Sequence, residues 1–285
     1  MPPVLSNAGA FLTRYKVLFC DIWGVVHNGR TAYVEGCAAL KRFRDDGGTV
    51  VLVSNAPRTP NVVAKILSEK DVPTDCWDAI VSSGGIALTH ASARGYRRVH
   101  HIGPERDLDL FDGSDLERVT LDAADAIMCT GLLRDREESG ESYRERLREP
   151  AARGLPLICA NPDLVVDVGD VQLPCAGAIA TVYEDLGGTV YWAGKPHGTA
   201  YETAMRDATS RRREAFTHSD VLAIGDAVRT DIAGAVAFGI DALFIAQGIH
   251  RAAIAPEGHI DVAALTDLFD NNAPDAVAAM MTLRW

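Results

Sequence analysis

The fold is decided by residues 18–26, which read Leu-Phe-Cys-Asp-Ile-Trp-Gly-Val-Val. The apolar run before Asp21 is typical of a buried strand, and such a strand would place this carboxylate at its carboxyl end. Gly24 then permits a sharp turn away from the strand. A carboxylate in this place can act as a nucleophile or as a metal ligand, although it can also simply cap the next element.

A second strand that ends in a carboxylate follows near the other end of the chain. Residues 221–226 read Val-Leu-Ala-Ile-Gly-Asp, and Asp231 follows Asp226 closely. If the two strands are neighbours, Asp21 and Asp226 converge, and a divalent cation would offset the repulsion between them. A ligand set made only of oxygen favours Mg²⁺ over Zn²⁺. For Asp231 two roles stay open, namely support of the metal site or the cap of the helix that it begins.

Two other polar groups also follow apolar runs. The run at 51–53 ends in Ser54 and Asn55, just before a helix start. A hydroxyl, a backbone N–H and a helix N-terminus together suit a phosphate group. Lys195 lies in a Gly-Lys-Pro sequence after another strand-like run, where it would be held in place to neutralise a phosphoryl group. Taken alone, the first pattern is also typical of a common turn and the second of a surface lysine.

Strand-like and helical patterns alternate over most of the chain. This alternation predicts an α/β fold with a Rossmann-like, doubly wound parallel sheet and helices on both of its faces. Ligands bind to such sheets at the carboxyl ends of the strands. The alternation is interrupted in the middle of the chain. We therefore expect a discontinuous core of residues 1–86 and 179–285, with a second α/β domain of residues 87–178 inserted into it.

The composition argues against several classes of protein. The chain has 285 residues, of which 47% are hydrophobic, a formal net charge of −11 and a pI near 5.2. The apolar fraction is too high for a disordered chain, and the acidic balance argues against a nucleic-acid partner. No run approaches the ~20 apolar residues of a membrane helix. The six cysteines are scattered and indicate reduced thiols, so we expect a cytoplasmic protein without a membrane partner.

The order of these motifs resembles one family over essentially the whole chain. The four motifs of the haloacid dehalogenase (HAD) superfamily occur in order, at Asp21, Ser54-Asn55, Gly194-Lys195-Pro196 and Gly225-Asp226 with Asp231. More narrowly, the chain resembles the subfamily of N-acetylglucosamine-phosphate and 4-nitrophenyl phosphatases, in which a large C2-type cap domain lies between the second and third motifs. The resemblance implies a HAD hydrolase core with an inserted α/β cap domain. It also implies a Mg²⁺-dependent phosphatase of a small sugar phosphate or aryl phosphate.

The resemblance implies a catalytic role for the acidic motif residues. Asp21 would attack phosphorus and form an aspartyl-phosphate, which water then hydrolyses. Mg²⁺ would be held by Asp21, by the backbone carbonyl of Trp23 and by Asp226, and Asp231 would support this metal site.

The two remaining motifs would bind the substrate. Ser54 and the backbone of Asn55 would hold the phosphoryl oxygens, and Lys195 would stabilise the charge that develops on them. The expected partner is therefore a small phosphorylated metabolite. Family analogy makes a homodimer a candidate assembly.

Trp23 departs from the pattern of the family. Its phosphatases usually carry a second aspartate here, which protonates the leaving alcohol and later activates water. Tryptophan has no titratable group, and the loss of a general acid/base typically costs ~10²–10⁴ in rate. Either the leaving group needs no protonation, or another side chain substitutes. His27 is one candidate for that substitute, with His197 and Asp163 as others.

Two alternatives to a phosphatase stay open. The chain could bind a phosphorylated ligand with little or no turnover, and Trp23 favours this hypothesis. It could also be a HAD enzyme of different chemistry, such as C–P or C–halogen cleavage, since such enzymes dispense with the second aspartate. The presence of Lys195 and Asp226 argues against a metal-free dehalogenase.

Overall fold

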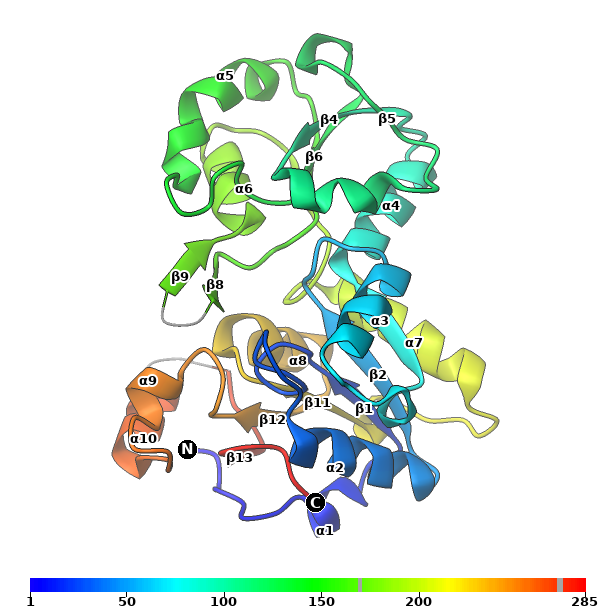
Figure 1. The fold of residues 1–285 in the computed structure, drawn as a ribbon, viewed down its shortest axis with the longest axis vertical. Helices are drawn as coiled ribbons and strands as arrows, with labels where there is room; N and C mark the ends of the chain where they lie inside the picture. Colours follow the sequence, from blue (N-terminus) through cyan, green and yellow to red (C-terminus); the bar gives the residue numbers. More distant parts are fainter. Residues whose placement is uncertain (169–170, 271–273) are drawn as a thin grey trace. The chain divides into compact units, whose positions relative to one another are not determined.

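The computed structural model describes residues 1–168, 171–270 and 274–285 (Figure 1). The chain divides into two compact units. Unit 1 consists of Met1–Ser54, Ala64–Val81 and Tyr201–Trp285. Unit 2 consists of Asn55–Val63 and Ser82–Ala200.

Unit 1 is built on a six-stranded sheet. Its strands are β1 (Val17–Cys20), β2 (Thr49–Ser54), β3 (Ala79–Ser82), β11 (Val221–Gly225), β12 (Asp241–Ile245) and β13 (Ala278–Met280). They lie in the order β13-β12-β11-β1-β2-β3. β1 pairs in parallel with β11 and β2, and β12 pairs in parallel with β11 and β13. β1 and β11 are buried along their whole length, as expected for central parallel strands that are covered on both faces.

β1 and β11 lie side by side although they are far apart in the sequence (Figure 1). Cys20 is in register with Ile224, and the N–H of Asp21 donates to the carbonyl of Ile224 at 2.8 Å. Asp21 and Asp226 therefore follow neighbouring strand ends. β2 pairs with the other side of β1, so Ser54 ends at the same edge of the sheet.

Helices connect the strands of unit 1. In α2 (Val34–Asp45), Cys37, Leu40 and Phe43 are buried at the three-residue spacing of one helix face. The helix ends just before Gly47, whose φ is +92°. The other helices of this unit are α1 (Gly9–Leu12), α8 (Ala233–Phe238), α9 (Arg251–Ile254), α10 (Val262–Asp270) and the short turns Thr74–Cys76, His218–Asp220 and Val228–Ile232. Two helices cross the division between the units, namely α3 (Pro60–Glu69) and α7 (Gly198–Arg211).

Unit 2 has a sheet and a core of its own. Its strands are β4 (Arg98–Ile102), β5 (Glu117–Arg118), β6 (Ala126–Cys129), β7 (Leu157–Cys159), β8 (Val165–Val168), β9 (Val171–Pro174) and β10 (Val190–Trp192). Five of them form a sheet in the order β10-β7-β6-β4-β5, with parallel pairing throughout, and β8 pairs antiparallel with β9. The helices are α4 (Ser83–Ala93), α5 (Arg144–Ala152), α6 (Ala176–Asp185) and the short turns Glu105–Phe111, Leu121–Ala123 and Gly140–Tyr143. The core contains Ile127 and Leu157 from the sheet, Leu147 from α5 and Tyr183 from α6.

Unit 2 differs in extent from the domain expected at residues 87–178. It runs from Ser82 to Ala200 and also includes Asn55–Val63. The expected core segment 179–285 includes the end of α6, which lies in the core of unit 2, and β10, which pairs with β7. Both sheets are parallel, so a strand such as β10 has the same apolar pattern in either of them. Its partner could not be identified from its own residues.

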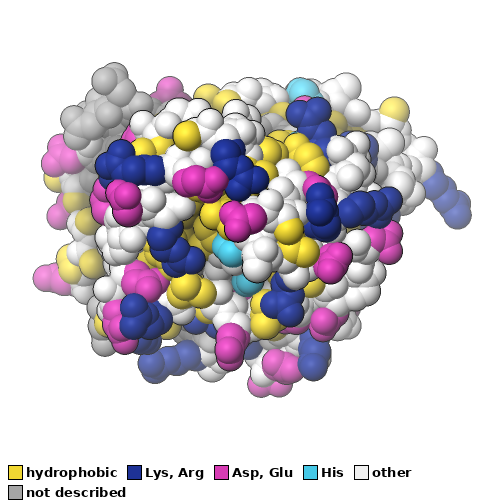
Figure 2. Space-filling model, turned by 90° about the horizontal axis from the view of Figure 1, so that it is seen from above, with side chains coloured by type: hydrophobic (Ala, Val, Ile, Leu, Met, Phe, Trp, Pro, Cys, Tyr) yellow, Lys and Arg dark blue, Asp and Glu magenta, His cyan; other side chains and the backbone are white. Residues whose placement is uncertain are grey.

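Two other expectations from the sequence concern membrane helices and the state of the cysteines. Among the described helices, none combines the length and the hydropathy that a membrane span requires. All six cysteines lie in the described residues, all are buried, and none forms a disulfide. On the face shown in Figure 2, basic and acidic side chains are interspersed.

Candidate active site

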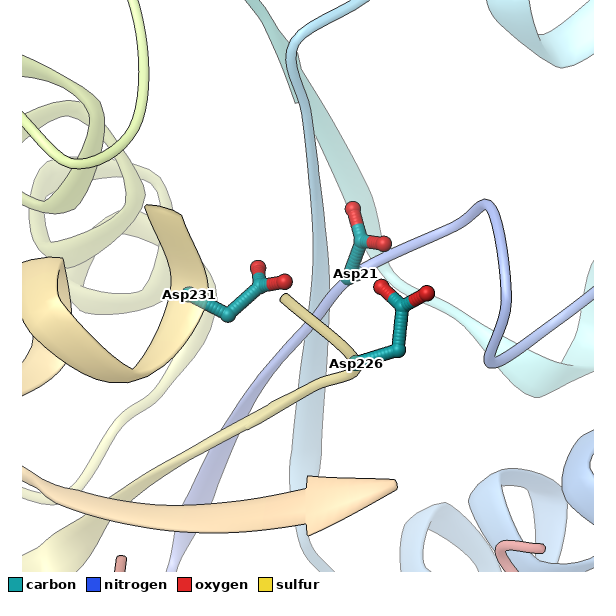
Figure 3. A group of neighbouring side chains, drawn as sticks. All are labelled: Asp21, Asp226 and Asp231. Carbon is teal, nitrogen blue, oxygen red and sulfur yellow. The ribbon is translucent and has the colours of Figure 1, made fainter. Parts of the chain in front are cut away.

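Three aspartates of unit 1 lie together at the carboxyl edge of its sheet. Asp21 follows β1, Asp226 follows β11, and Asp231 lies in the helical turn before α8. All three are buried, and one carboxylate oxygen from each lies within 4.8 Å of the others. In Figure 3 the carboxylates of Asp21 and Asp226 face each other, and that of Asp231 extends towards them. The sequence predicted that the first two converge if their strands are neighbours. β1 and β11 do pair, and the structure brings all three carboxylates together.

The donor set of this cluster suits a hard divalent cation. Buried carboxylates so close together repel one another, and a bound cation would offset that repulsion. The three side chains offer only oxygen ligands. Mg²⁺ prefers such ligands, whereas Zn²⁺ is also bound well by nitrogen and sulfur. Asp21 and Asp226 could therefore hold Mg²⁺.

The carboxylate of Asp226 is fixed by backbone on two sides. A Cβ atom on Gly24 would lie 2.3 Å from its Oδ2, and a Cβ atom on Gly248 would lie 1.7 Å from the same oxygen. The backbone N–H of Ile249 donates to Oδ2 at 2.7 Å. Gly24 also has a φ of +84°, so it is needed both for its conformation and for its small size. From the sequence, Gly24 could be identified only as a turn residue, and Gly248 was not identified at all, although it lies in the loop after β12.

Asp231 is held by the segment that precedes it. Its Oδ2 accepts a hydrogen bond from the N–H of Ala227 at 3.1 Å, and a Cβ atom on Gly225 would lie 2.1 Å from its Cγ. The hydroxyl of Tyr201 donates to its backbone carbonyl at 3.0 Å. α8 begins after Ile232 and has no side-chain cap. The structure therefore does not support the reading of Asp231 as a helix cap, and it places this carboxylate against the other two.

The loop after β1 carries Trp23 and His27. The N–H of Gly29 donates to Nδ1 of His27 at 2.8 Å, which leaves the ring proton of the neutral imidazole on Nε2. Burial, with a smaller contribution from Lys70, lowers the pKa of His27 to about 4. The Trp23 indole lies edge-on to the His27 ring at 5.2 Å. His27 thus packs inside the loop in a neutral form, a setting that does not favour it as the substitute acid.

Asn55 joins Lys195 within unit 2. Its Oδ1 accepts from the backbone N–H of Lys195 at 2.8 Å, and its Nδ2 donates to the backbone carbonyl of Lys195 at 2.9 Å. Nδ2 also donates to Asp163 Oδ1 at 2.8 Å, and the hydroxyl of Ser83 donates to Oδ1 at 3.2 Å. Lys195 is only 4% exposed, so it is a positioned residue and not a surface lysine. The sequence motif predicted a role only for the backbone of Asn55, whereas the structure also shows one for its side chain.

Gly194 allows this close approach. A Cβ atom at that position would lie 2.1 Å from the hydroxyl oxygen of Ser83 and 2.5 Å from Oδ1 of Asn55. Its φ of +155° also disfavours other residues.

Two further candidates for the missing acid also have partners. The carboxylate of Asp163 accepts a hydrogen bond from Asn55, and the ring of His197 stacks on Trp192 with 5.4 Å between the ring centroids.

Comparisons with known proteins identify the family of the chain. A family model described as haloacid dehalogenase-like hydrolase matches residues 18–117, and a HAD-hydrolase-like model matches residues 192–278. The chain is similar to a crystal structure of a hydrolase of the haloacid dehalogenase-like family from Brucella suis 1330. The two are 41% identical, the match covers 99% of this chain and 100% of that chain, and the TM-score is 0.84.

Two other proteins are more distant. The 5'-nucleotidase YutF of Bacillus subtilis is 26% identical over 243 residues, which are 84% of this chain and 90% of that protein. A p-nitrophenyl phosphatase from Archaeoglobus fulgidus is 21% identical, with 94% of this chain and 96% of that chain covered and a TM-score of 0.73. The likeness to the Archaeoglobus phosphatase shows a shared fold.

Proposed function

The chain belongs to the haloacid dehalogenase-like hydrolase family, and we propose that it is a Mg²⁺-dependent phosphatase of small phosphorylated metabolites. The observation that carries this proposal is the cluster of Asp21, Asp226 and Asp231 at the carboxyl edge of the sheet. The names of the Bacillus nucleotidase and the Archaeoglobus phosphatase support phosphate ester hydrolysis. The proposed substrates are sugar phosphates or aryl phosphates.

Asp21 is the proposed nucleophile. Its carboxylate oxygen forms a bond to phosphorus while the bond from phosphorus to the leaving oxygen breaks, and water then hydrolyses the aspartyl-phosphate. A Mg²⁺ ion held by Asp21, the carbonyl of Trp23 and Asp226 would supply positive charge next to the transferred group. Asp231 supports this arrangement from the helical turn. The fixed position of the Asp226 carboxylate means that the site needs little reorganisation.

Ser54, Asn55 and Lys195 are proposed to bind the phosphoryl group. Ser54 ends β2 at the same sheet edge as Asp21, and Asn55 follows it directly. The hydrogen bonds between Asn55 and Lys195 link the lysine to this segment. In these roles the hydroxyl, the backbone N–H and the ammonium group stabilise the negative charge of the phosphoryl oxygens.

A second candidate function is the binding of a phosphorylated ligand with little turnover. Trp23 favours it, because the residue at this position cannot donate a proton to a leaving alcohol. The two functions differ in one measurable property. A phosphatase releases phosphate with multiple turnovers, whereas a binding protein is saturated by the ligand without releasing phosphate.

The test is a screen for phosphate release from aryl phosphates, sugar phosphates and nucleoside 5'-monophosphates, with and without millimolar Mg²⁺. We expect Mg²⁺-dependent turnover of at least one class and its loss in Asp21→Asn. Asp45→Asn is the matched control, because Asp45 lies exposed on α2, where it forms an ion pair with Lys41. Turnover that survives Asp21→Asn would remove Asp21 as the nucleophile. Saturable binding without turnover would favour the second candidate. Cleavage of phosphonates or haloacids would indicate a different chemistry on this fold.

A further inference from the structure

The backbone of Trp23 lies beside the acidic cluster. Asp21, two residues before it, belongs to that cluster. Gly24, directly after it, approaches Asp226 so closely that a Cβ atom would clash with the carboxylate. The chain is therefore anchored against the cluster on both sides of Trp23, and the indole begins from a backbone position next to the proposed reaction centre.

The indole is held in place and yet accessible. A Cβ atom on Gly29 would lie 2.5 Å from Cη2 of the indole, so this end of the ring rests directly on the backbone of Gly29. His27 lies against the ring edge. Lys70 donates to the carbonyl of Gly29 and thereby ties this part of the loop to the residues after α3. Even so, Trp23 is 36% exposed, so part of this braced residue remains accessible.

We propose that Trp23 determines specificity by selecting phosphate monoesters whose leaving group is an aromatic hydroxyl. This inference rests on the proposed phosphatase function and names its substrate class. The exposed indole offers an aromatic ring a stacking surface, and such contacts contribute about 0.5–1.5 kcal/mol beyond simple burial. The same residue supplies no proton, so in this proposal the leaving group departs without one.

An aryl leaving group satisfies that condition. When Asp21 forms its bond to phosphorus, the electron pair of the breaking P–O bond passes to the phenolic oxygen, which leaves as a phenolate and later takes a proton from water. A phenol has a pKa of about 10. An alcohol is about as weak an acid as bulk water, whose pKa is about 15.7, so an alkoxide is a much poorer leaving group than a phenolate. An alkyl phosphate therefore needs the missing acid far more than an aryl phosphate does.

The first experiment measures kcat/KM for 4-nitrophenyl phosphate, phenyl phosphate, glycerol phosphate and a nucleoside 5'-monophosphate. We expect the two aryl esters to be preferred at least 100-fold over glycerol phosphate, since a general acid typically contributes ~10²–10⁴. The nucleotide combines an aromatic base with an alkyl leaving group. If it is hydrolysed as fast as phenyl phosphate, selection by the leaving group is overturned.

Substitutions at Trp23 then connect the preference to this residue. In Trp23→Asp we expect glycerol phosphate hydrolysis to rise at least tenfold, while that of 4-nitrophenyl phosphate falls about five- to tenfold because the stacking surface is lost. Trp285→Phe is the control, because Trp285 is exposed to a similar degree at the other end of the chain and should leave both rates unchanged. Equal changes for both substrates in a folded Trp23→Asp protein would overturn the proposal.

A binding measurement covers the case in which Trp23→Asp does not fold. Phenylphosphonate and methylphosphonate resist hydrolysis, and calorimetry measures their affinity for the wild type and for Trp23→Leu in the presence of Mg²⁺. We expect Trp23→Leu to weaken phenylphosphonate about five- to tenfold and methylphosphonate less than twofold. Equal effects on both ligands would overturn the stacking role.

The failure of the proposed function can be told apart from the failure of this inference. A protein that binds both ligands but hydrolyses no ester would contradict the phosphatase function, and with it this inference. Unselective hydrolysis that Asp21→Asn abolishes would overturn the inference alone.

Discussion

A Cβ atom on Gly248 would lie 1.7 Å from Oδ2 of Asp226. The loop after β12 thus packs its backbone directly against the carboxylate, and the next residue, Ile249, donates its N–H to the same oxygen. The backbone of this loop therefore contributes directly to the position of this proposed metal ligand. A change at Gly248 therefore acts on the acidic cluster without altering any charge.

Gly248→Ala tests this packing. The added methyl group must displace either the loop or the carboxylate, and overpacking of this kind costs about 1–3 kcal/mol. We expect the Mg²⁺ concentration for half-maximal phosphate release to rise at least tenfold, measured by metal titration of the activity. Gly131→Ala is the control, because its Cβ atom would meet nothing closer than 3.5 Å. An unchanged metal titration in Gly248→Ala would show that the loop yields without moving Asp226.

The second prediction concerns repulsion within the acidic cluster. Without a cation, three buried carboxylates within 4.8 Å destabilise the folded chain. We expect Asp21→Asn to raise the free energy of unfolding in EDTA by about 1–3 kcal/mol, measured by urea unfolding. Mg²⁺ should stabilise the wild type by about 2.7 kcal/mol at a hundred times its Kd, and Asp21→Asn by much less. A variant that is less stable than the wild type in EDTA would contradict this.

Asn55→Ala tests the link to Lys195. It removes the partners of the backbone N–H and carbonyl of Lys195, and each buried group left without a partner costs about 1–3 kcal/mol. We expect a clear loss of stability by thermal unfolding and at least a tenfold fall in kcat/KM. Asn61→Ala, at an exposed position of α3, should change stability by less than about 0.5 kcal/mol. A stable Asn55→Ala protein with normal kinetics would show that Lys195 does not depend on this side chain.

The fourth prediction is a pH dependence of stability that arises in unit 2. Burial, with smaller contributions from Arg118 and His100, lowers the pKa of His101 to about 4. Between pH 6.5 and 4 the unfolded chain binds a proton at this residue and the folded chain does not. Stability therefore falls as the pH decreases through this window, by up to about 1.4 kcal/mol per pH unit.

His101→Gln measures this contribution. The stability of the wild type relative to the variant should decrease as the pH is lowered from 7 to 4.5, as followed by urea unfolding at each pH. His259→Gln is the matched control, because the side chain of His259 is 71% exposed. Parallel pH profiles for the wild type and His101→Gln would contradict the prediction.

The sequence predicted those features that depend on position along a strand. Asp21 and Asp226 each follow an apolar run, and parallel strands bring such ends to one edge of a sheet, so their meeting could be predicted on the condition that the two strands are neighbours. The α/β fold could be predicted for the same reason. Membership of β10 in the second sheet could not, because strand pairing is decided by contacts remote from the strand itself.

The close approaches of backbone to side chains at the site could not be predicted from the sequence either. Gly248 and Asn55 act through packing and hydrogen bonds with residues far away in the chain. A glycine after a strand is common, so Gly248 carries no local sign that a carboxylate occupies the space of its missing side chain. The signal that could have found it is its place after β12, at the edge where the proposed ligands lie.

The interleaved order of the strands has a consequence for synthesis on the ribosome. β1 is flanked by β2, which is made soon after it, and by β11, which is made only after the whole of unit 2. Throughout that interval the nascent polypeptide presents one side of a buried, apolar strand without its neighbour. Bare strand edges recruit other chains, so the emerging polypeptide passes through an aggregation-prone stage in which chaperones would raise the yield of native enzyme.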